Sequence, residues 1–257
     1  MNSNDKSRRE IRPESSQPGI DTEARPSSSL DRESRLDAEL VRPAELRPDS
    51  PVLAYALGDA LYLNVTSSCT LGCVFCPKIR DGDWVVGGFD LRLRRNPDVE
   101  DVWRAALEAG ISNRPEVVFT GLGEPTRRLD VVLEITRRLK AAGVERVRVD
   151  TDGLASLREG RDVVPELAAA GVDALSVSLN AADGETYARF CPNPYGAAAW
   201  DAVRDFIRSA VGHIPDVAAS CVALPGLSEA DCQREAESLG ARFRWRPYDR
   251  LGRVEGV

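Results

Sequence analysis

Short apolar runs alternate with amphipathic stretches along most of the chain. The apolar runs predict strands at residues 61–66, 116–120, 146–150, 174–179, 217–223 and 242–246. Helical patterns fill the intervals at residues 98–110, 127–142, 162–170, 197–211 and 228–239. This alternation is typical of βα units with right-handed crossovers and a parallel sheet. The pattern therefore predicts an α/β fold, a partial (βα)6 TIM-like open barrel of parallel strands.

Polar and apolar side chains also alternate within several of the predicted strands. A parallel strand that is buried on both faces is normally apolar throughout. Because the outer face has to pack against helices, we expect the apolar side chains to point outward and the polar ones to line the barrel interior. The predicted interior set is Asn64, Arg148, Asp150, Ser178, Arg244 and Arg246. For residues 242–246, the last strand, a solvent-exposed sheet edge explains the alternation equally well.

Residues 1–51 differ in composition from the rest of the chain. They are rich in Ser, Arg, Glu, Asp and Pro and poor in apolar residues, which predicts a disordered tail before a core domain at 52–257. The chain carries 34 basic and 41 acidic residues, and the resulting net charge of −7 disfavours binding to nucleic acid or an acidic membrane. No apolar stretch suits a signal peptide or a membrane span, so we expect a cytoplasmic protein.

Three cysteines follow the first predicted strand. Cys69, Cys73 and Cys76 have the spacing C-x3-C-x2-C. Three soft thiolates on one loop suit a cubane iron–sulfur cluster and leave one iron without a protein ligand. A structural zinc site needs a fourth ligand with paired spacing, but His213, the one histidine, lies far downstream. A disulfide framework is disfavoured because three thiols this close cannot pair off. The spacing therefore predicts a [4Fe-4S] cluster.

A second motif follows the strand at 116–120. It reads Gly121-Leu122-Gly123-Glu124-Pro125, which by itself indicates little more than a turn. Downstream of the cysteine loop, and with Phe75 just before the third cysteine, it resembles the G-G-E-P element of the radical S-adenosylmethionine (SAM) superfamily. Leu122 between the two glycines is a small departure from that element. The resemblance makes residues 52–257 a radical SAM core domain.

Longer runs extend the resemblance. VVFTGLGEPTRRLDVVLEI, VSLNAADGETYARFC and LGARFRWRPY, among others, are similar to the TatD-associated radical SAM family from about Ala54 to Tyr248. The resemblance implies that SAM binds the open iron and is cleaved to a 5′-deoxyadenosyl radical. That radical would remove a hydrogen atom from an unidentified substrate, which we expect to be small and polar or anionic. An electron donor such as a flavodoxin or ferredoxin is implied as a partner.

The resemblance also implies roles for particular residues. Cys69, Cys73 and Cys76 would hold the cluster. The cofactor-binding set for SAM would be Phe75 near the adenine, Gly121, Gly123 and Glu124 at the methionine amino group, and Thr151, Ser178 and Asn180 at the ribose or carboxylate.

Substrate contacts are less defined by the sequence. Cys191 would donate a hydrogen atom or touch substrate, although a small buried hydrophobe is the plainer interpretation. A carboxylate or phosphate group of the substrate would be bound by Arg148, Arg244 and Arg246, because a guanidinium group can form bidentate hydrogen bonds. Two other functions stay open: an activating enzyme that makes a radical on a partner protein, and a non-catalytic iron–sulfur electron carrier, which the G-x-G-E-P motif argues against.

Overall fold

The protein is represented by a computed structural model that describes residues 51–248. The predicted disordered tail lies outside the described residues except for its last position, and so does the end of the predicted core domain at 249–257. None of the helices in the described part has the length and apolar character that a membrane crossing requires.

One sheet organises the described residues. It has seven strands in the order β1-β2-β5-β6-β7-β8-β9. Their bounds are β1 (Ala54–Leu57), β2 (Ala60–Leu63), β5 (Glu116–Phe119), β6 (Arg146–Thr151), β7 (Ala174–Ser178), β8 (Asp216–Val222) and β9 (Arg242–Arg246). All pairs from β2 to β9 are parallel, and β1 and β9 form the two edges. The predicted open barrel is therefore confirmed.

The sequence pattern missed three elements of strand structure. β1 pairs antiparallel with β2 through a tight turn at Gly58, which has a positive φ of 57°. A small hairpin of β3 (Val85–Val86) and β4 (Phe89–Asp90) lies in the stretch after the cysteine loop, where we expected no regular structure. β3 and β4 have two residues each, too few for an alternating pattern, and β1 is a run of four apolar residues with no alternation of polar and apolar positions.

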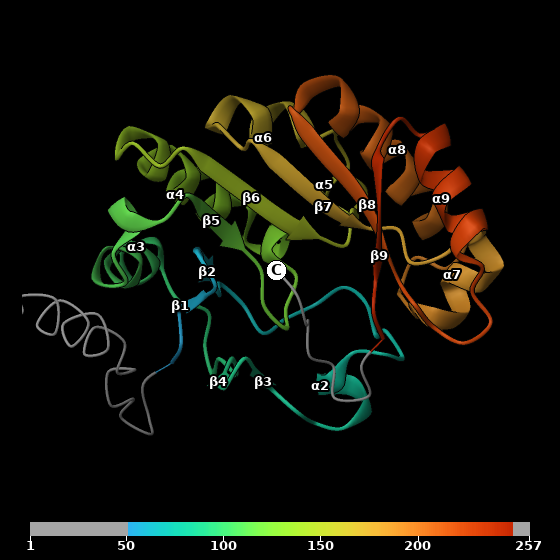
Figure 1. Cartoon of the computed structure of the whole chain (residues 1–257), viewed down its shortest axis with the longest axis horizontal. Coiled ribbons are helices and arrows are strands. Elements are labelled where there is room, and N and C mark those ends of the chain that lie inside the picture. The colour runs from blue at the N-terminus through green and yellow to red at the C-terminus, as the bar shows by residue number, and fades with distance from the viewer. Residues whose placement is uncertain (1–50, 249–257) are drawn as a thin grey trace, which may run out of the picture. The chain divides into compact units, whose positions relative to one another are not determined.

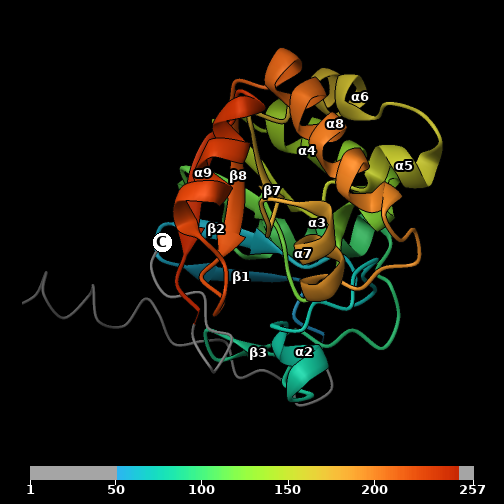
Figure 2. The same cartoon turned by 90° about the vertical axis from the view of Figure 1, so that its right-hand side faces the viewer.

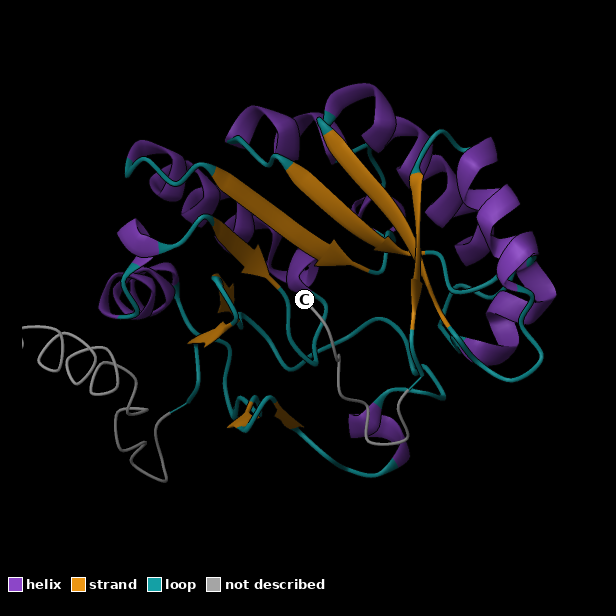
Figure 3. Cartoon of the chain, viewed as in Figure 1, coloured by secondary structure: helices purple, strands orange, loops and turns teal. Residues whose placement is uncertain are grey.

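The five predicted helices are present and cover the outer side of the sheet. They are α3 (Val99–Glu108), α4 (Leu129–Ala141), α6 (Val164–Ala170), α8 (Ala198–His213) and α9 (Glu229–Ser238). Figure 1 shows α4, α6, α8 and α9 along the convex side of the curved sheet, and Figure 3 shows the strands as one layer inside them. Short extra turns are α2 (Pro77–Arg80), α5 (Ala155–Glu159), α7 (Gly184–Phe190), η1 (Ile111–Asn113) and η2 (Pro125–Arg128). In Figure 2, α2 and β3 lie together, apart from the outer helices.

The outward side chains of the strands form the main core. The apolar members of the alternating strands are completely or almost completely buried against the helices: Leu61, Leu63, Val147, Val149, Leu175 and Val177. Burying one such side chain contributes about 1.5–3 kcal/mol to folding. The expected orientation, apolar outward and polar inward, holds for β6 and β7.

The inward face is polar on one side of the barrel and apolar on the other. Towards β1, a second apolar cluster is built around Tyr55, Tyr62 and Val118. The expectation for Asn64 was wrong, because its fully buried amide Nδ2 donates to the carbonyls of Val52 (3.0 Å) and Leu91 (2.9 Å). Asn64 thus ties the chain before β1 and after β4 to the sheet, and it does not line the cavity described below.

Candidate active site

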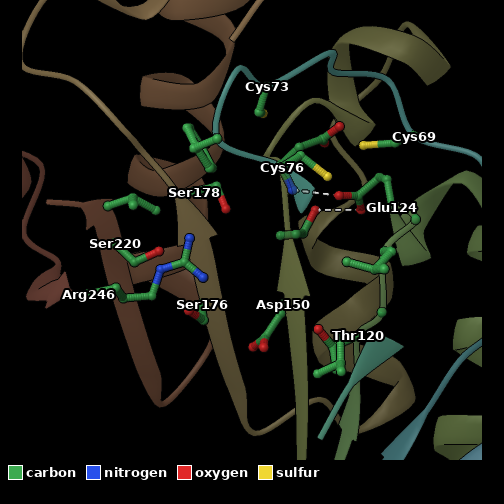
Figure 4. A pocket seen from close by; sticks show the side chains of 18 of the residues that line it. Cys69, Cys73, Cys76, Thr120, Glu124, Asp150, Ser176, Ser178, Ser220 and Arg246 are labelled. Carbon is green, nitrogen blue, oxygen red and sulfur yellow. Dashed lines mark hydrogen bonds between the residues drawn. The ribbon is translucent and has the colours of Figure 1, made fainter. Parts of the chain in front are cut away.

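A cavity of about 340 Å³ opens at the carboxyl ends of the parallel strands. Its wall combines the cysteine loop, the G-L-G-E-P loop and the ends of β6 to β9. The carboxyl end of a βα barrel is where its loops converge and where its enzymes place their chemistry. Figure 4 shows the side chains that reach into this space: Cys69, Cys73, Cys76, Thr120, Glu124, Asp150, Ser176, Ser178, Ser220 and Arg246.

The three cysteines of the motif line one end of the cavity. Each is a free thiol with intermediate exposure. Burial, with the nearby charge of Glu124, raises the pKa of Cys69 to about 12, and burial also raises the pKa of Cys76. These thiols are therefore neutral until a metal replaces their protons.

The donor set fits an iron–sulfur cluster. Within residues 51–248, no three Cys, His, Asp or Glu side chains converge on a point where one metal ion would bind. A cubane cluster needs no such convergence, because each thiolate binds a different iron atom. Three thiols facing one cavity from a short loop are thus a suitable set for the predicted cluster.

Hydrogen bonds join the cysteine loop to the G-L-G-E-P loop. The amide of Glu124 donates to the carbonyl of Ser68 at 2.8 Å. Lys78 of α2 donates to the carbonyls of Ser67 (3.1 Å) and Leu122 (2.6 Å). A Cβ atom on Gly123 would lie 2.0 Å from the carbonyl oxygen of Thr66, so glycine is required at this close approach.

Glu124 is the most highly connected side chain of the cavity wall. Its Oε1 accepts from the amide and hydroxyl of Thr126 (2.9 and 2.6 Å) and from the hydroxyl of Thr151 (2.8 Å). Its Oε2 accepts from the amide of Asp152 at 2.6 Å, and the side chain is 3% exposed. Burial and the neighbouring Asp152 raise the pKa of Glu124 to about 8, and these donated hydrogen bonds oppose that shift. Glu124 and Thr151, both predicted site residues, are thus brought together.

Ser178 and Asn180 also reach the cavity, from the end of β7. Asn180 is the one non-glycine residue of the described chain with a positive φ, 58°. Asparagine tolerates this left-handed conformation better than most residues, and such positions concentrate at functional sites. Its buried Oδ1 has no hydrogen-bond partner among the described residues, whereas its Nδ2 donates to Cys191 Sγ at 3.4 Å.

Cys191 lies behind the cysteine loop. Its thiol is fully buried, is absent from the cavity wall and contacts Cys73, with 3.6 Å between the two Sγ atoms. This placement agrees with the plainer interpretation of Cys191 as a small buried hydrophobe, and a role at the substrate stays a prediction. The Cys191 sulfur thus contacts both a predicted cluster ligand, Cys73, and the amide of Asn180.

The three predicted arginines all line the cavity, but their surroundings differ. Arg148 is held by two carboxylates, with Nε 3.3 Å from Glu116 and Nη1 bonded to Asp150. Arg244 and Arg246 have no hydrogen bond or ion pair to their side chains within residues 51–248. β9 is an edge strand, and Arg244 and Arg246 nevertheless face the cavity rather than open solvent.

Some wall residues were not predicted. Asp152, Ser176 and Ser220 lie on the inward side of their strands or strand ends and line the cavity. The alternation along β7 that indicated Ser178 also indicates Ser176. Tyr55 and Tyr248 also line the cavity. Tyr55 lies on the missed strand β1, which carried no signal in the sequence.

Comparison with known proteins identifies the family. A family model described as the radical SAM superfamily matches residues 63–239, which is more than half of the chain. The chain belongs to the radical SAM superfamily. It is therefore an enzyme, and the superfamily resemblance of its cysteine and G-L-G-E-P motifs is confirmed. The finer resemblance to the TatD-associated family stays a prediction.

Curated relatives share part of their length with this radical SAM protein. One from Saccharolobus solfataricus, named probable GTP 3′,8-cyclase, is 33% identical over 157 residues, 60% of this chain and 45% of that protein. Another of the same name, from Thermococcus kodakarensis, is 30% identical over 171 residues, 66% of this chain and 50% of that protein. The chain thus spans about half the length of the curated relatives it matches.

Solved structures share the fold. Streptococcus suis SuiB aligns with a TM-score of 0.54 and 18% identity, over 74% of this chain and 40% of that chain. A radical SAM methyltransferase from Sphaerobacter thermophilus aligns with a TM-score of 0.51 and 22% identity, over 76% of this chain and 57% of that chain. At these identities the likeness concerns the barrel and not the reaction.

Proposed function

We propose that this radical SAM enzyme holds a [4Fe-4S] cluster through Cys69, Cys73 and Cys76 and cleaves SAM at the open iron. The observation that carries the proposal is the shared wall of one cavity, where the cysteine loop and the Gly123-Glu124 segment are hydrogen-bonded to each other. When bound, the cluster and SAM supply a 5′-deoxyadenosyl radical, which takes a hydrogen atom from a small, polar or anionic substrate.

The chain's own residues bind and orient SAM in this proposal. Gly121 and Gly123 expose backbone at the cavity, and Glu124 binds the methionine amino group. The positive charge of that group favours the ionised form of Glu124 and so opposes the rise in pKa that burial causes. Thr151 fixes the orientation of Glu124 through its hydroxyl. Ser178, Asn180 and Phe75 line the same cavity and are assigned to the carboxylate, ribose and adenine of SAM.

The first test is anaerobic reconstitution of the full-length protein with iron and sulfide. We expect a [4Fe-4S]⁺ EPR signal that changes when SAM is added, and slow release of 5′-deoxyadenosine with dithionite as reductant. Cys76→Ser should lose the cluster, whereas Cys232→Ser, a buried cysteine of α9, should keep it. A cluster whose EPR signal does not change when SAM is added would favour the electron-carrier function instead. Tightly bound zinc in place of iron would contradict the proposal.

The substrate can be sought with the same assay. The names of the curated relatives give GTP as the first compound to test, with an increase in 5′-deoxyadenosine release as the readout. A reduced flavodoxin or ferredoxin should replace dithionite as the physiological class of electron donor. A radical detected on an added partner protein would instead favour the activating-enzyme function.

A further inference from the structure

The inward face of β6 and β9 carries more basic than acidic charge. Five arginines occupy it, and three acidic side chains face them. The arginines are Arg146, Arg148, Arg242, Arg244 and Arg246, and the acids are Glu116, Asp150 and Asp216. The three acids form ion pairs with Arg146, Arg148 and Arg242. The excess positive charge therefore lies at the cavity.

The arginines at the amino ends of the strands are paired with acidic side chains. Arg146 bonds Glu116 and Asp216, with 2.9 Å between Arg146 Nε and Glu116 Oε1. Arg242 bonds Asp216 at 3.2 Å, and its side chain is 59% exposed. Asp150 is bonded to Arg148 one layer higher. The charge of Asp150 also reaches Arg244 and Arg246, but no acid of the described chain forms an ion pair with either of them.

Arg246 is the most unusual of these side chains. Its Nε is buried and has no hydrogen-bond partner in the described part of the chain. Figure 4 shows its guanidinium pointing into the cavity from β9. Burial lowers the pKa of Arg246, the charge of Asp150 opposes that shift, and the like charge of Arg244 adds to it. Asp150 is bonded to Arg148, so a single carboxylate faces three guanidinium groups, and a bound anion would offset the cost of partly burying them.

Serine hydroxyl groups lie on the strands next to Arg244 and Arg246. The cross-strand register places Ser178 opposite Ser220 and Ser220 opposite Arg244, so these three residues form one inward row. Ser176 lines the cavity one step lower on β7. Guanidinium and hydroxyl donors at one spot match the oxygen atoms of a carboxylate or phosphate.

The other carboxyl groups of the cavity belong to its opposite end. Glu124 and Asp152 are linked to the G-L-G-E-P loop and to each other by the bond from the Asp152 amide to Glu124 Oε2. The cavity therefore carries carboxyl groups where the cationic SAM would bind and guanidinium groups along β9. These two ends prefer ligands of opposite charge.

We infer that Arg244 and Arg246 form an oxyanion subsite that binds a carboxylate or phosphate group of the substrate. This inference rests on the proposed function only in assigning the anion to the substrate. The anion-binding property itself belongs to the folded chain and is measured separately. Arg148 is a positioning residue in this arrangement, because it holds Asp150 beside the subsite.

The test measures anion binding to the full-length, reconstituted protein by calorimetry, with inorganic phosphate and succinate as probes and chloride as the salt control. We expect saturable binding of at least one probe, and its identity distinguishes a phosphate from a carboxylate site. Arg246→Gln and Arg244→Gln should each weaken binding about tenfold or more, the loss expected for a charge-assisted hydrogen bond. Arg242→Gln, on the same face of the same strand but outside the cavity, should change affinity less than about twofold.

A second measurement separates binding from folding. Because the Arg246 side chain has no bonded partner in the described chain, Arg246→Gln should unfold at the same temperature as wild type or higher. A large drop in melting temperature would show a structural role and overturn the inference. Equal losses of affinity in the Arg242, Arg244 and Arg246 variants, or no binding of either probe, would also overturn it.

These results are distinguishable from failure of the proposed function. If wild type cleaves SAM but binds neither probe, the subsite is wrong and the radical chemistry stands. If wild type binds a probe through Arg246 but never cleaves SAM, the subsite stands and the proposed function fails.

Discussion

At the scale of single residues, the active site depends on close backbone approaches more than on isolated catalytic groups. Gly123 packs its Cα against the carbonyl of Thr66, while the next residue, Glu124, bonds the carbonyl of Ser68. A side chain at position 123 would push the two loops apart. The cysteines and Glu124 would then no longer face the same cavity.

Gly123→Ala tests this dependence. The added Cβ would meet the Thr66 carbonyl at 2.0 Å, so the loop has to move. We expect a loss of stability of about 1–3 kcal/mol, the usual cost of overpacking, and loss of the SAM-induced change in the EPR signal. Urea unfolding and EPR of the reconstituted protein measure the two effects.

Gly212→Ala is the matched control. Gly212 lies in α8 with no atom within 4 Å of an added Cβ, so alanine should be neutral or stabilising by up to about 1 kcal/mol. If the Gly123 and Gly212 variants behaved alike, the close approach of the two loops would not matter for the site.

At the scale of elements, ion pairs at the amino ends of the strands fix the register of the barrel wall. Asp216, at the start of β8, bonds Arg146 of β6 and Arg242 of β9. Glu116, at the start of β5, bonds Arg146 from the other side. This network joins strands that are not all neighbours and leaves the carboxyl ends free for the cavity.

Asp216→Asn should weaken the barrel in a pH-dependent way. Although burial opposes it, the hydrogen bonds from Arg146 and Arg242 lower the pKa of Asp216 below its usual value. Ionised Asp216 therefore stabilises the fold above about pH 4, and this contribution is lost as pH falls through the lowered pKa. We expect the variant to lose about 1 kcal/mol of unfolding free energy near pH 7, with the difference shrinking on acidification.

Urea unfolding of wild type and variant, from about pH 7 to about pH 3, measures this difference. Asp205→Asn is the control, because the Asp205–Arg208 pair is largely exposed and within one helix. It should change stability by less than about 0.5 kcal/mol. A difference for Asp216→Asn that grew on acidification would contradict the assigned direction of the pKa shift.

At the scale of the whole described domain, most of the core lies away from the active site. The main core lies between the sheet and the outer helices, and the cysteine loop touches it at one border, through Leu71, Cys73 and Phe75. The folding energy of the barrel comes from that core, so cluster binding adds to a fold that exists without it. Small zinc domains behave differently, because their core is too small to form before the metal binds.

Removing the cluster should therefore leave the barrel folded. After chelation under anaerobic conditions, we expect unchanged far-UV circular dichroism and a cooperative unfolding transition. Trypsin should cut faster after Lys78 or Arg80 of α2, next to the freed thiols, and at an unchanged rate after Arg208 on the exposed side of α8. Loss of the unfolding transition on chelation would show that the cluster is part of the folding nucleus.

The order of the predicted strands and helices could be read from the amino-acid sequence, because hydrophobic periodicity and helix signals are local. The sequence also indicated the cysteine motif, the G-L-G-E-P motif and the polar inner face of β6 and β7. It could not separate an exposed edge from a cavity wall at β9, since both give the same alternation. It missed β3 and β4 because two-residue strands have no period to detect, and β1 because its four apolar residues do not alternate with polar ones.

Which polar side chains line the cavity depends on the packing of the strands and could not be predicted from the sequence. Asn64 was expected in the interior but bonds two carbonyls distant in sequence, and the sequence left open whether Cys191 is buried or meets substrate, whereas the structure buries it against Cys73. The three predicted arginines have the same sequence signature, yet Arg148 is paired while Arg244 and Arg246 are not. The physical reason is that an ion pair or a thiol contact depends on strand register and distance, which periodicity along one strand does not contain.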